Sequence, residues 1–374
     1  MHTGDLHLGK QIGEVSLIED QGYILDQMTE VAKREKADGV LIAGDVYQRS
    51  APQAEAMELF DRFVTELAGM GMKVFVISGN HDSELRISYF ARLVKRAGVY
   101  VSEKFEGSMG RVTLKDEYGE VDVWMLPFIR PSRVKPYLPE ERIVTYQDAA
   151  RAVIRNCDVD RRRRNVLLAH QFITGCETSE SEERAVGGLD NIDAAVFEDF
   201  DYVALGHIHK PQRVSRDTLR YSGSPLKYSF SEAGHKKSVA IVDVEEKGSV
   251  RVRTVPLMPI RDMRTAEGTM RELVDMPYTD DYMWVTVKDD TVPPDAKWAL
   301  RANYPNMLRF SVDNARQRYD RDVSGGESVE NKSFMELFTE FYREMNNGVD
   351  PAQDRMKVME KVRKELEEAE YETR

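Results

Sequence analysis

Cysteine is scarce in this chain of 374 residues: only Cys157 and Cys176 are present, and no Cys-x-x-Cys motif occurs. That scarcity argues against a disulfide framework and favours a reducing compartment with free thiols. No apolar run approaches the roughly 18 residues that a membrane-spanning helix needs, and no basic stretch followed by an apolar core marks the N-terminus. We therefore expect a soluble cytoplasmic protein of two or three domains.

Histidine is also scarce, yet six of the seven histidines lie inside or directly beside five short motifs. The motifs are Gly-Asp-Leu-His at 4–7, Gly-Asp at 44–45, Gly-Asn-His-Asp at 79–82, Ala-His at 169–170 and Gly-His-Ile-His at 206–209. Most of them follow an apolar run that predicts a buried strand. Residues just past the carboxyl ends of such strands meet at one edge of an α/β sheet, where these folds place their sites.

The motif residues combine imidazole nitrogens with carboxylate and amide oxygens, a donor set that suits Mn, Fe or Zn better than Ca or Mg. We assign two metal positions that share Asp45 as a bridging carboxylate. The first metal position comprises Asp5, His7, Asp45 and His209, and the second metal position comprises Asp45, Asn80, His170 and His207. Two aspartates against two dications leave the centre positive, which suits a phosphodiester. His2 and His235 are interpreted as structural histidines.

Longer stretches around the motifs carry a family resemblance. They are residues 2–10 (His-Thr-Gly-Asp-Leu-His-Leu-Gly-Lys), 79–83, 206–210, 221–225 (Tyr-Ser-Gly-Ser-Pro), 228–232 (Tyr-Ser-Phe-Ser-Glu) and 236–238. Together they resemble the SbcD/Mre-eleven nuclease family of the calcineurin-like metallophosphoesterase superfamily, over essentially the whole chain. The resemblance implies an α/β fold: a two-layered β-sandwich flanked by helices, with a small α/β capping domain and a helical C-terminal tail.

The same resemblance implies a function. It predicts a manganese-dependent DNA nuclease with single-strand endonuclease and double-strand exonuclease activity, acting on ends and hairpins in repair, recombination and replication. It also implies a partner, the coiled-coil ABC ATPase SbcC, and a homodimer within a heterotetramer at the bacterial nucleoid. His81 has no metal left to bind, so we expect it beside the scissile phosphate, where it stabilises developing charge or protonates the leaving oxygen.

The chain departs from the family pattern at two places. Several apolar residues precede the His-Thr pair in the family, whereas Met1 abuts His2 here, so the strand that should position Asp5 and His7 is expected to be nearly absent. Relatives carry Asp or His where this chain has Gln48. We expect Gln48 to accept a hydrogen bond from His81 through its amide oxygen, with Asp82 as the alternative orienting residue.

The net charge of −12 is unusual for a DNA-binding protein, because affinity for DNA comes largely from Lys and Arg on phosphates. Acidic residues crowd 177–183, and basic residues gather at 161–164, which we expect to form a solvated turn ahead of a strand. The candidate DNA-binding residues are Lys10, beside the first motif, and Lys210 and Lys227, after the last. The acidic balance fits a subunit that grips DNA with the help of a partner.

Periodicity predicts the elements around the motifs. An amphipathic helix is expected over 17–35, and the capping-box spacing from Ser50 to Gln53 predicts the start of a second helix. Residues 112–128 alternate around a Tyr-Gly turn, which predicts a hairpin leading out of the core. Residues 260–314 follow the pattern strand, helix, strand, helix, strand.

These patterns divide the chain into a nuclease core at 1–256, a capping domain at 257–314, a linker at 315–332 and a tail at 333–374. An aromatic stripe at helical spacing marks the tail: Phe334, Leu337, Phe338, Phe341 and Tyr342. A helix so apolar on one face packs on its own chain or on a partner. By resemblance, the partner would be the base of the SbcC coiled coil.

Two other classes of function compete with a nuclease. The first is a metallophosphoesterase with another substrate, such as a protein phosphatase, a nucleotidase or a small-molecule phosphodiesterase. Residues 48–50 and Asp82 match the phosphatase pattern only in part. The second is a non-catalytic scaffold, which requires a broken ligand set, whereas every expected ligand is present in this sequence.

Overall fold

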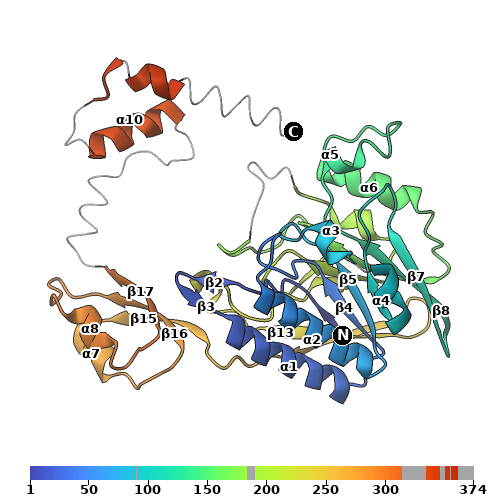
Figure 1. Ribbon diagram of the computed structural model, residues 1–374, viewed down its shortest axis with the longest axis horizontal. Helices are drawn as coiled ribbons and strands as arrows, with labels where there is room; N and C mark the ends of the chain where they lie inside the picture. The colour runs from blue at the N-terminus through green and yellow to red at the C-terminus, as the bar shows by residue number, and fades with distance from the viewer. Residues whose placement is uncertain (90, 183–189, 314–333, 346–349, 354, 361–374) are drawn as a thin grey trace. The chain divides into compact units, whose positions relative to one another are not determined.

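The computed structural model describes residues 1–89, 91–182, 190–313, 334–345, 350–353 and 355–360 (Figure 1). The chain divides into two units. One unit contains Met1–Val287 and Pro293–Ser311, and the other contains Lys288–Val292 and the chain from Val312 onward. Within the described residues, no helix combines the length and the apolar character that crossing a bilayer requires.

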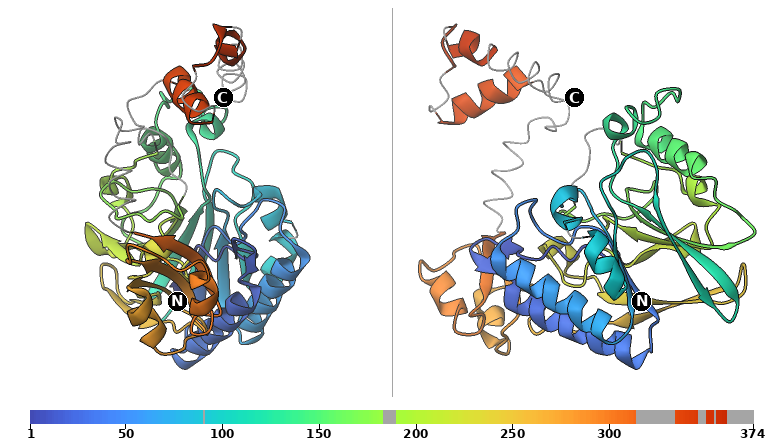
Figure 2. Two further views of the ribbon diagram at one scale, coloured as in Figure 1. Left: turned by 90° about the vertical axis from the view of Figure 1, so that its left-hand side faces the viewer. Right: turned by 45° about the vertical axis from the view of Figure 1, so that its right-hand side comes forward.

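Two six-stranded sheets form the centre of the first unit (Figures 1 and 2). The first sheet runs in the order β14 (Val250–Pro256), β13 (Ser238–Val244), β1 (His2–Thr3), β4 (Gly39–Ala43), β5 (Lys73–Ile77) and β6 (Val99–Val101). The second runs in the order β11 (Gln212–Val214), β12 (Arg216–Tyr221), β10 (Tyr202–Gly206), β9 (Arg164–His170), β8 (Gly119–Leu126) and β7 (Gly110–Asp116). The predicted two-layered sandwich is therefore confirmed.

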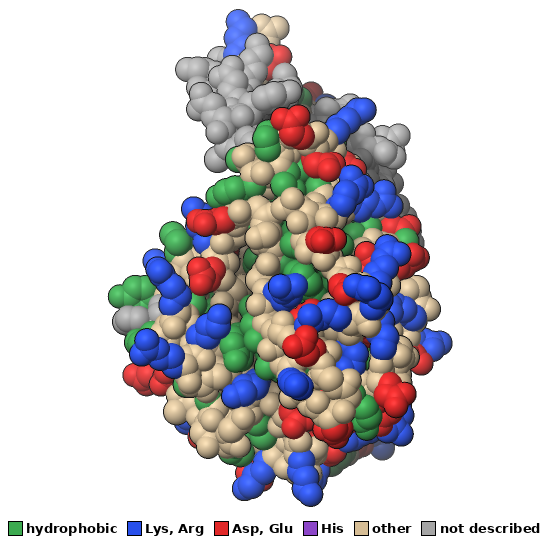
Figure 3. Space-filling model, turned by 90° about the vertical axis from the view of Figure 1, so that its right-hand side faces the viewer, with side chains coloured by type: hydrophobic (Ala, Val, Ile, Leu, Met, Phe, Trp, Pro, Cys, Tyr) green, Lys and Arg blue, Asp and Glu red, His purple; other side chains and the backbone are tan. Residues whose placement is uncertain are grey.

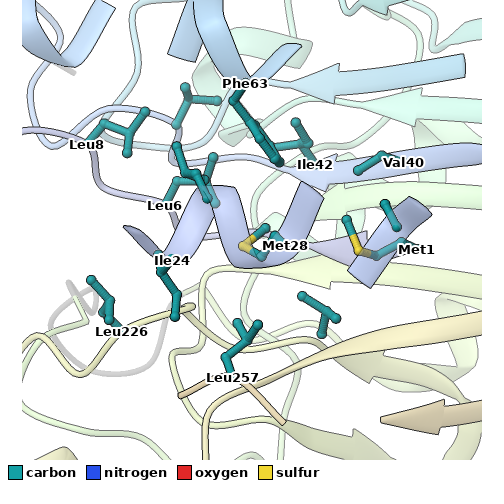
Figure 4. Packing of buried hydrophobic residues seen from close by; sticks show 14 of the residues in the cluster. Met1, Leu6, Leu8, Ile24, Met28, Val40, Ile42, Phe63, Leu226 and Leu257 are labelled. Carbon is teal, nitrogen blue, oxygen red and sulfur yellow. The ribbon is translucent and has the colours of Figure 1, made fainter. Parts of the chain in front are cut away.

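Apolar side chains fill the space between the sheets and beneath the helices. Phe75 and Ile77 of the first sheet cluster with Leu168 and Tyr202 of the second. Helices α1 (Ile18–Arg34) and α2 (Ala54–Gly69) lie side by side and cover the outer face of the first sheet. Figure 4 shows Ile24 and Met28 of α1 in a second cluster, which packs between these helices and the first sheet. Each such side chain contributes roughly 1.5–3 kcal/mol when fully buried, so the layers hold the strand ends firmly.

Strand β1 is only two residues long, as expected, yet it occupies the middle of the first sheet. It pairs with β4 in parallel and with β13 in antiparallel orientation. The Met1 carbonyl accepts a hydrogen bond from the Leu41 N–H at 2.8 Å, and the Met1 ammonium donates to the Gly39 carbonyl at 2.8 Å. Pairing on both sides therefore anchors this short strand and the ligand loop that follows it.

Most of the other predicted elements are confirmed, and two predictions are wrong in detail. Helix α1 matches the expected helix over 17–35. Helix α2 begins at Ala54 with Gln53 as a cap that makes no side-chain hydrogen bond, so Ser50 does not form a capping box. The hairpin of β7 and β8 does not leave the core, because β8 also pairs in parallel with β9 and extends the second sheet.

The segment after β14 has the predicted element order. It comprises β15 (Met263–Gly268), α7 (Met270–Asp275), β16 (Tyr282–Val287), α8 (Ala296–Leu300) and β17 (Met307–Val312), with sheet order β15-β16-β17. The Asp20 carboxylate of α1 accepts hydrogen bonds from Arg261 at 2.9 Å and from the Tyr282 hydroxyl at 2.8 Å. These contacts tie the small sheet to the helix that packs beneath the ligand loops.

In the second unit, the expected tail helix is confirmed as α10 (Phe334–Met345). Phe341 is 60% exposed, whereas Phe338 and Tyr342 are half-buried and contact one another. The side chains of Phe334 and Leu337, and the predicted linker at 315–332, lie outside the described residues. Residues 355–360 are helical, and Arg355 lies over the Tyr342 ring, so the next helix covers part of the aromatic stripe.

Candidate metal centre

All five motifs converge at the carboxyl ends of strands from both sheets. Asp5, Asp45 and Asn80 follow β1, β4 and β5 of the first sheet, while His170 ends β9 and His207 follows β10 of the second. Register brings the second pair together, because His170 and Gly206 are partners in the β9–β10 ladder. The sandwich thus places residues that lie far apart in the sequence around one buried point.

The ligand loops hold unusual backbone conformations. Asp5, His7 and Asp45 adopt left-handed φ angles of 52°, 44° and 47°. Non-glycine residues in this region cost of order 1 kcal/mol each, and such strain gathers at functional sites. Hydrogen bonds between the loops offset it, since the Asp5 N–H donates to the Gly44 carbonyl at 3.0 Å and the His7 N–H donates to the Asp45 carbonyl at 2.9 Å.

Glycine precedes several ligands because the loops approach one another too closely for a side chain. A Cβ atom at Gly79 would lie 2.0 Å from Asp45 Oδ1, and one at Gly206 would lie 1.8 Å from the Ala43 carbonyl oxygen. Neither contact is sterically possible. These glycines therefore let the two sheets bring their ligands into one cluster.

Asp45 clusters within 4.8 Å both with His7 and His81 and with Asp5 and His170. Donor atoms also lie close together within each of the two assigned metal positions. In the first, His7 Nε2 lies 3.0 Å from His209 Nε2, and Asp5 joins these two histidines in a cluster whose ligand atoms all lie within 4.8 Å of one another. In the second, Asn80 Oδ1 lies 3.0 Å from both His170 Nε2 and His207 Nδ1.

Asp45 lies between the two groups. Its Oδ2 atom is 3.6 Å from His7 Nε2 and 3.4 Å from His170 Nε2, and the residue is buried. Burial alone would raise the pKa of Asp45, but the His170 and His7 imidazoles hold it well below its usual range. An ionised carboxylate in this place is suited to bridge two cations.

These residues fit divalent metal ions. Two facing ring nitrogens at 3.0 Å cannot both carry a proton, and Asp5 Oδ2 is buried without a hydrogen-bond partner among the described residues. Burial raises the pKa of Asp5 to about 7, so the protein alone does not compensate the charge of this carboxylate well. Burial also lowers the pKa of His207 to about 3, which keeps its imidazole neutral. Cations placed between these donors would satisfy both groups.

His81 lies beside Asp45 and His7 in the cluster, and its action on the substrate stays a prediction. Its backbone N–H donates to Asp45 Oδ1 at 2.9 Å, and its ring is partly open to solvent. The expected contact with the Gln48 side chain is wrong: His81 Nδ1 lies 3.1 Å from the backbone carbonyl oxygen of Gln48. Any residue at position 48 supplies that carbonyl. The presence of glutamine instead of Asp or His therefore does not remove the contact that orients His81.

Asp82 does not orient His81 either. Its carboxylate accepts backbone N–H groups from Val46 at 3.1 Å, Tyr47 at 3.0 Å and Gly79 at 2.9 Å. Those bonds fasten the Asp45 loop to the Asn80 loop. The contacts thus indicate that Asp82 positions the loops rather than contacting the substrate.

The lysines expected to bind DNA are engaged within the protein to different degrees. The Lys227 ammonium contacts the Ala233 carbonyl at 2.7 Å, Asp262 and the Met263 carbonyl, so it is held within the protein, and its role in DNA binding stays a prediction. Lys210 pairs with Glu177 at the surface, where such a pair is weak and exchangeable. Lys10 is half-buried, on the loop after His7.

The basic cluster at 161–164 is paired throughout, and it is not a fully solvated turn. Arg161, Arg162 and Arg163 contact nearby acidic groups, and Arg164 is buried against Asp116. Side chains of both signs also intermingle over the face drawn in Figure 3. Because these arginines pair with acidic side chains, the cluster does not form a basic patch that could attract DNA phosphates.

Several buried polar residues near the site were not predicted. Gln21 of α1 donates to the Leu6 and His7 carbonyls and accepts the Gly9 N–H, so it fixes the first ligand loop. Glu232 is fully buried and pairs with Lys237. The only sequence signal for Glu232 was its place in the conspicuous stretch at 228–232. His2, by contrast, is structural as expected: its Nδ1 lies 2.8 Å from the Tyr202 hydroxyl.

Comparison with known proteins agrees with this geometry. The family model described as "Calcineurin-like phosphoesterase" matches residues 1–211. The chain is also 32% identical over 319 residues to the SbcD subunit of the SbcCD nuclease of Staphylococcus epidermidis, a match that covers 83% of this chain and 84% of that protein. The chain belongs to the SbcD family of calcineurin-like phosphoesterases. The family's phosphoesterase fold implies divalent metal ions, for which the clustered donors are candidate ligands.

Two further similarities complete the comparison. Residues 259–346 match the family model "Type 5 capsule protein repressor C-terminal domain", which spans the small sheet and α10. Among solved structures, a dimetal phosphatase from Danio rerio is 12% identical with a TM-score of 0.38, over 68% of this chain and 98% of that one.

Proposed function

We propose that this SbcD-family chain is a manganese-dependent DNA nuclease that hydrolyses phosphodiesters with two metal ions. The observation that carries the proposal is the pair of buried ligand groups on either side of Asp45. The relative from Staphylococcus epidermidis is named as a nuclease, which supports nucleic acid as the substrate class. Single-strand endonuclease and double-strand exonuclease activity on ends and hairpins, in the bacterial cytoplasm, complete the proposal.

Each group in the site would have a distinct task. Asp5, His7, Asp45 and His209 would hold one metal ion, and Asp45, Asn80, His170 and His207 would hold the other. Bound there, the ions would offset phosphate charge and activate water for attack. His81 is positioned by its bonds to Asp45 and to the Gln48 carbonyl, and its side chain is 13% exposed. It would stabilise charge on the phosphate or protonate the leaving oxygen.

An assay with three substrates tests this function. We expect the manganese-loaded protein to cleave labelled single-stranded and hairpin DNA, and a chelator to stop cleavage. A nitrophenyl phosphodiester run in parallel reports hydrolysis that does not depend on DNA. Hydrolysis of the small diester without any cleavage of DNA would favour another phosphoesterase, and a metal-loaded protein inert toward every substrate would favour a scaffold.

We also propose that α10 binds an SbcC-like coiled-coil ATPase, with the chain as a homodimer within a heterotetramer. The supporting observation is Phe341, which is 60% exposed on a helix that has an aromatic face. A helix that docks in a groove presents anchors at this spacing.

Replacing Phe341 with Glu should weaken copurification with the ATPase while leaving cleavage of short single strands unchanged. The side chain is largely in solvent, so its loss does not threaten folding. Deletion of residues 333–374 serves as the reference for complete loss of binding. If the Phe341→Glu protein and the deleted protein both copurify with the ATPase as well as the unchanged chain does, α10 is not the docking element.

A further inference from the structure

One metal ligand, His209, has a chain of polar side chains behind it. Its Nδ1 atom lies 2.7 Å from Ser181 Oγ, and Ser181 Oγ lies 2.5 Å from Glu232 Oε1. The same Nδ1 atom lies 3.4 Å from Glu232 Oε1 directly, so the shorter contact runs through Ser181. The other oxygen of Glu232 lies 2.5 Å from the Lys237 ammonium. Glu232 and Lys237 are both buried, at 0% and 5% exposure. A series of four groups therefore runs inward from the metal-facing ring.

The groups at the two ends of this series decide which group donates each hydrogen bond. Lys237 is an ammonium donor, so Glu232 is suited to be the carboxylate acceptor of the buried pair. The Ser181 hydroxyl then donates its hydrogen to Glu232, and its oxygen accepts the Nδ1–H of His209. With the proton on Nδ1, the Nε2 lone pair of His209 points toward His7 and the first metal position.

The backbone of His209 is held by the same groups. Glu182, the neighbour of Ser181, accepts the His209 N–H at 2.8 Å. Lys237 donates to the His209 carbonyl at 2.8 Å. Side chain and backbone of this ligand are thus fixed together by the segment at 177–182 and by Glu232 and Lys237. The acidic segment therefore has a structural use, because Glu182 holds the backbone of His209.

The contacts behind two other histidine ligands differ from this series. His170 Nδ1 contacts the Ala43 backbone carbonyl at 2.8 Å, a contact that no side-chain substitution at position 43 removes. His7 Nδ1 has no hydrogen-bond partner among the described residues. Of these three histidines, His209 is therefore the one whose Nδ1 atom contacts side chains behind the ring, and it is assigned to the first metal position only.

We propose that Ser181, Glu232 and Lys237 are positioning residues that fix the tautomer and orientation of His209 and thereby set the metal affinity of the first position separately from the second. The inference rests on the metal centre of the proposed function and adds a selective control of one of its two ions. Groups that orient a metal-bound histidine typically change metal affinity by about 10–100-fold when removed.

The test is manganese binding to the full chain, measured by equilibrium dialysis and by the electron paramagnetic resonance of the free ion. Ser181→Ala should weaken the binding of one of the two manganese ions at least tenfold and leave the affinity for the other unchanged. Ser181→Thr, which keeps the hydroxyl, should restore the affinity. Ser231→Ala is the matched control, because Ser231 contacts the same segment through the Glu180 N–H but is not in hydrogen-bond contact with His209.

Cleavage assays give a second readout. Excess manganese should restore the rate of Ser181→Ala, since the substitution changes the metal concentration at half-maximal rate and not the rate at saturation. Unchanged affinity at both positions, equal weakening of both, or the same loss in Ser231→Ala would overturn the proposal. Metal binding is measured without DNA. If Ser181→Ala selectively weakens one metal position but the unchanged chain cleaves no DNA, the proposed nuclease activity is refuted and this inference is not.

Discussion

Replacement of Asp45 by alanine should abolish DNA cleavage and reduce metal binding at both positions. The Oδ2 atom of Asp45 lies within 3.6 Å of a ligand nitrogen from each group, so its loss removes a donor from both. Metal content per chain after gel filtration is the measurement. His207→Ala is the comparison, and it should mainly empty the second position.

The alanine substitution also removes the acceptor of the His81 N–H, so a second variant guards against a folding defect. Asp45→Asn keeps an oxygen at that place but removes the charge, and it should likewise lose activity while retaining the melting temperature. An Asp45→Ala protein that still holds two metal ions per chain would be incompatible with a bridge.

Replacement of His81 by alanine should leave both metals bound and DNA affinity intact, yet slow cleavage by about 100-fold or more. This magnitude is typical for the loss of a positioned acid or charge stabiliser. We assign His81, whose Nε2 atom lies 4.0 Å from Asp45 Oδ2, to neither metal position, so metal content should not fall. Single-turnover cleavage at saturating manganese is the appropriate measurement.

Gln48→Ala provides the matched control for His81. It should cleave DNA within a few-fold of the unchanged rate, because His81 is held by the carbonyl of residue 48 and not by its side chain. A His81→Ala protein as active as the Gln48→Ala protein would exclude a chemical role for the imidazole.

Much of the centre could be predicted because its signals are local. A short apolar run that ends in glycine and a donor residue predicts both a buried strand and a ligand at its end. Strands β4, β5 and β10 confirm this pattern, and β9 ends in a ligand that follows alanine instead of glycine. Parallel pairing then brings the ends together without any further information. The segment from β15 to β17 was predictable for the same reason, since its periodicity changes clearly from strand to helix and back.

The supporting residues could not be predicted, because their roles depend on contacts between distant segments. Ser181 and Glu232 are 51 positions apart, and neither stands in a pattern that distinguishes a buried hydroxyl or carboxylate from an exposed one. The role of residue 48 is carried by a backbone atom, which no side-chain pattern reports. Lys227 follows a conspicuous motif, yet it is occupied by Asp262 from the small sheet.

At Asp5, His7 and Asp45 the left-handed backbone lowers the stability of the fold, while the side chains supply the donors of the site. Glycine at any of these positions would relieve the backbone, and at Asp5 it would also remove a buried oxygen that lacks a hydrogen-bond partner among the described residues. At a core position such as Ile42 there is no such conflict, because the residue that stabilises the fold also supports the site. In variants selected for stability alone, substitutions should therefore be favoured at the ligand loops before they are favoured in the sheets.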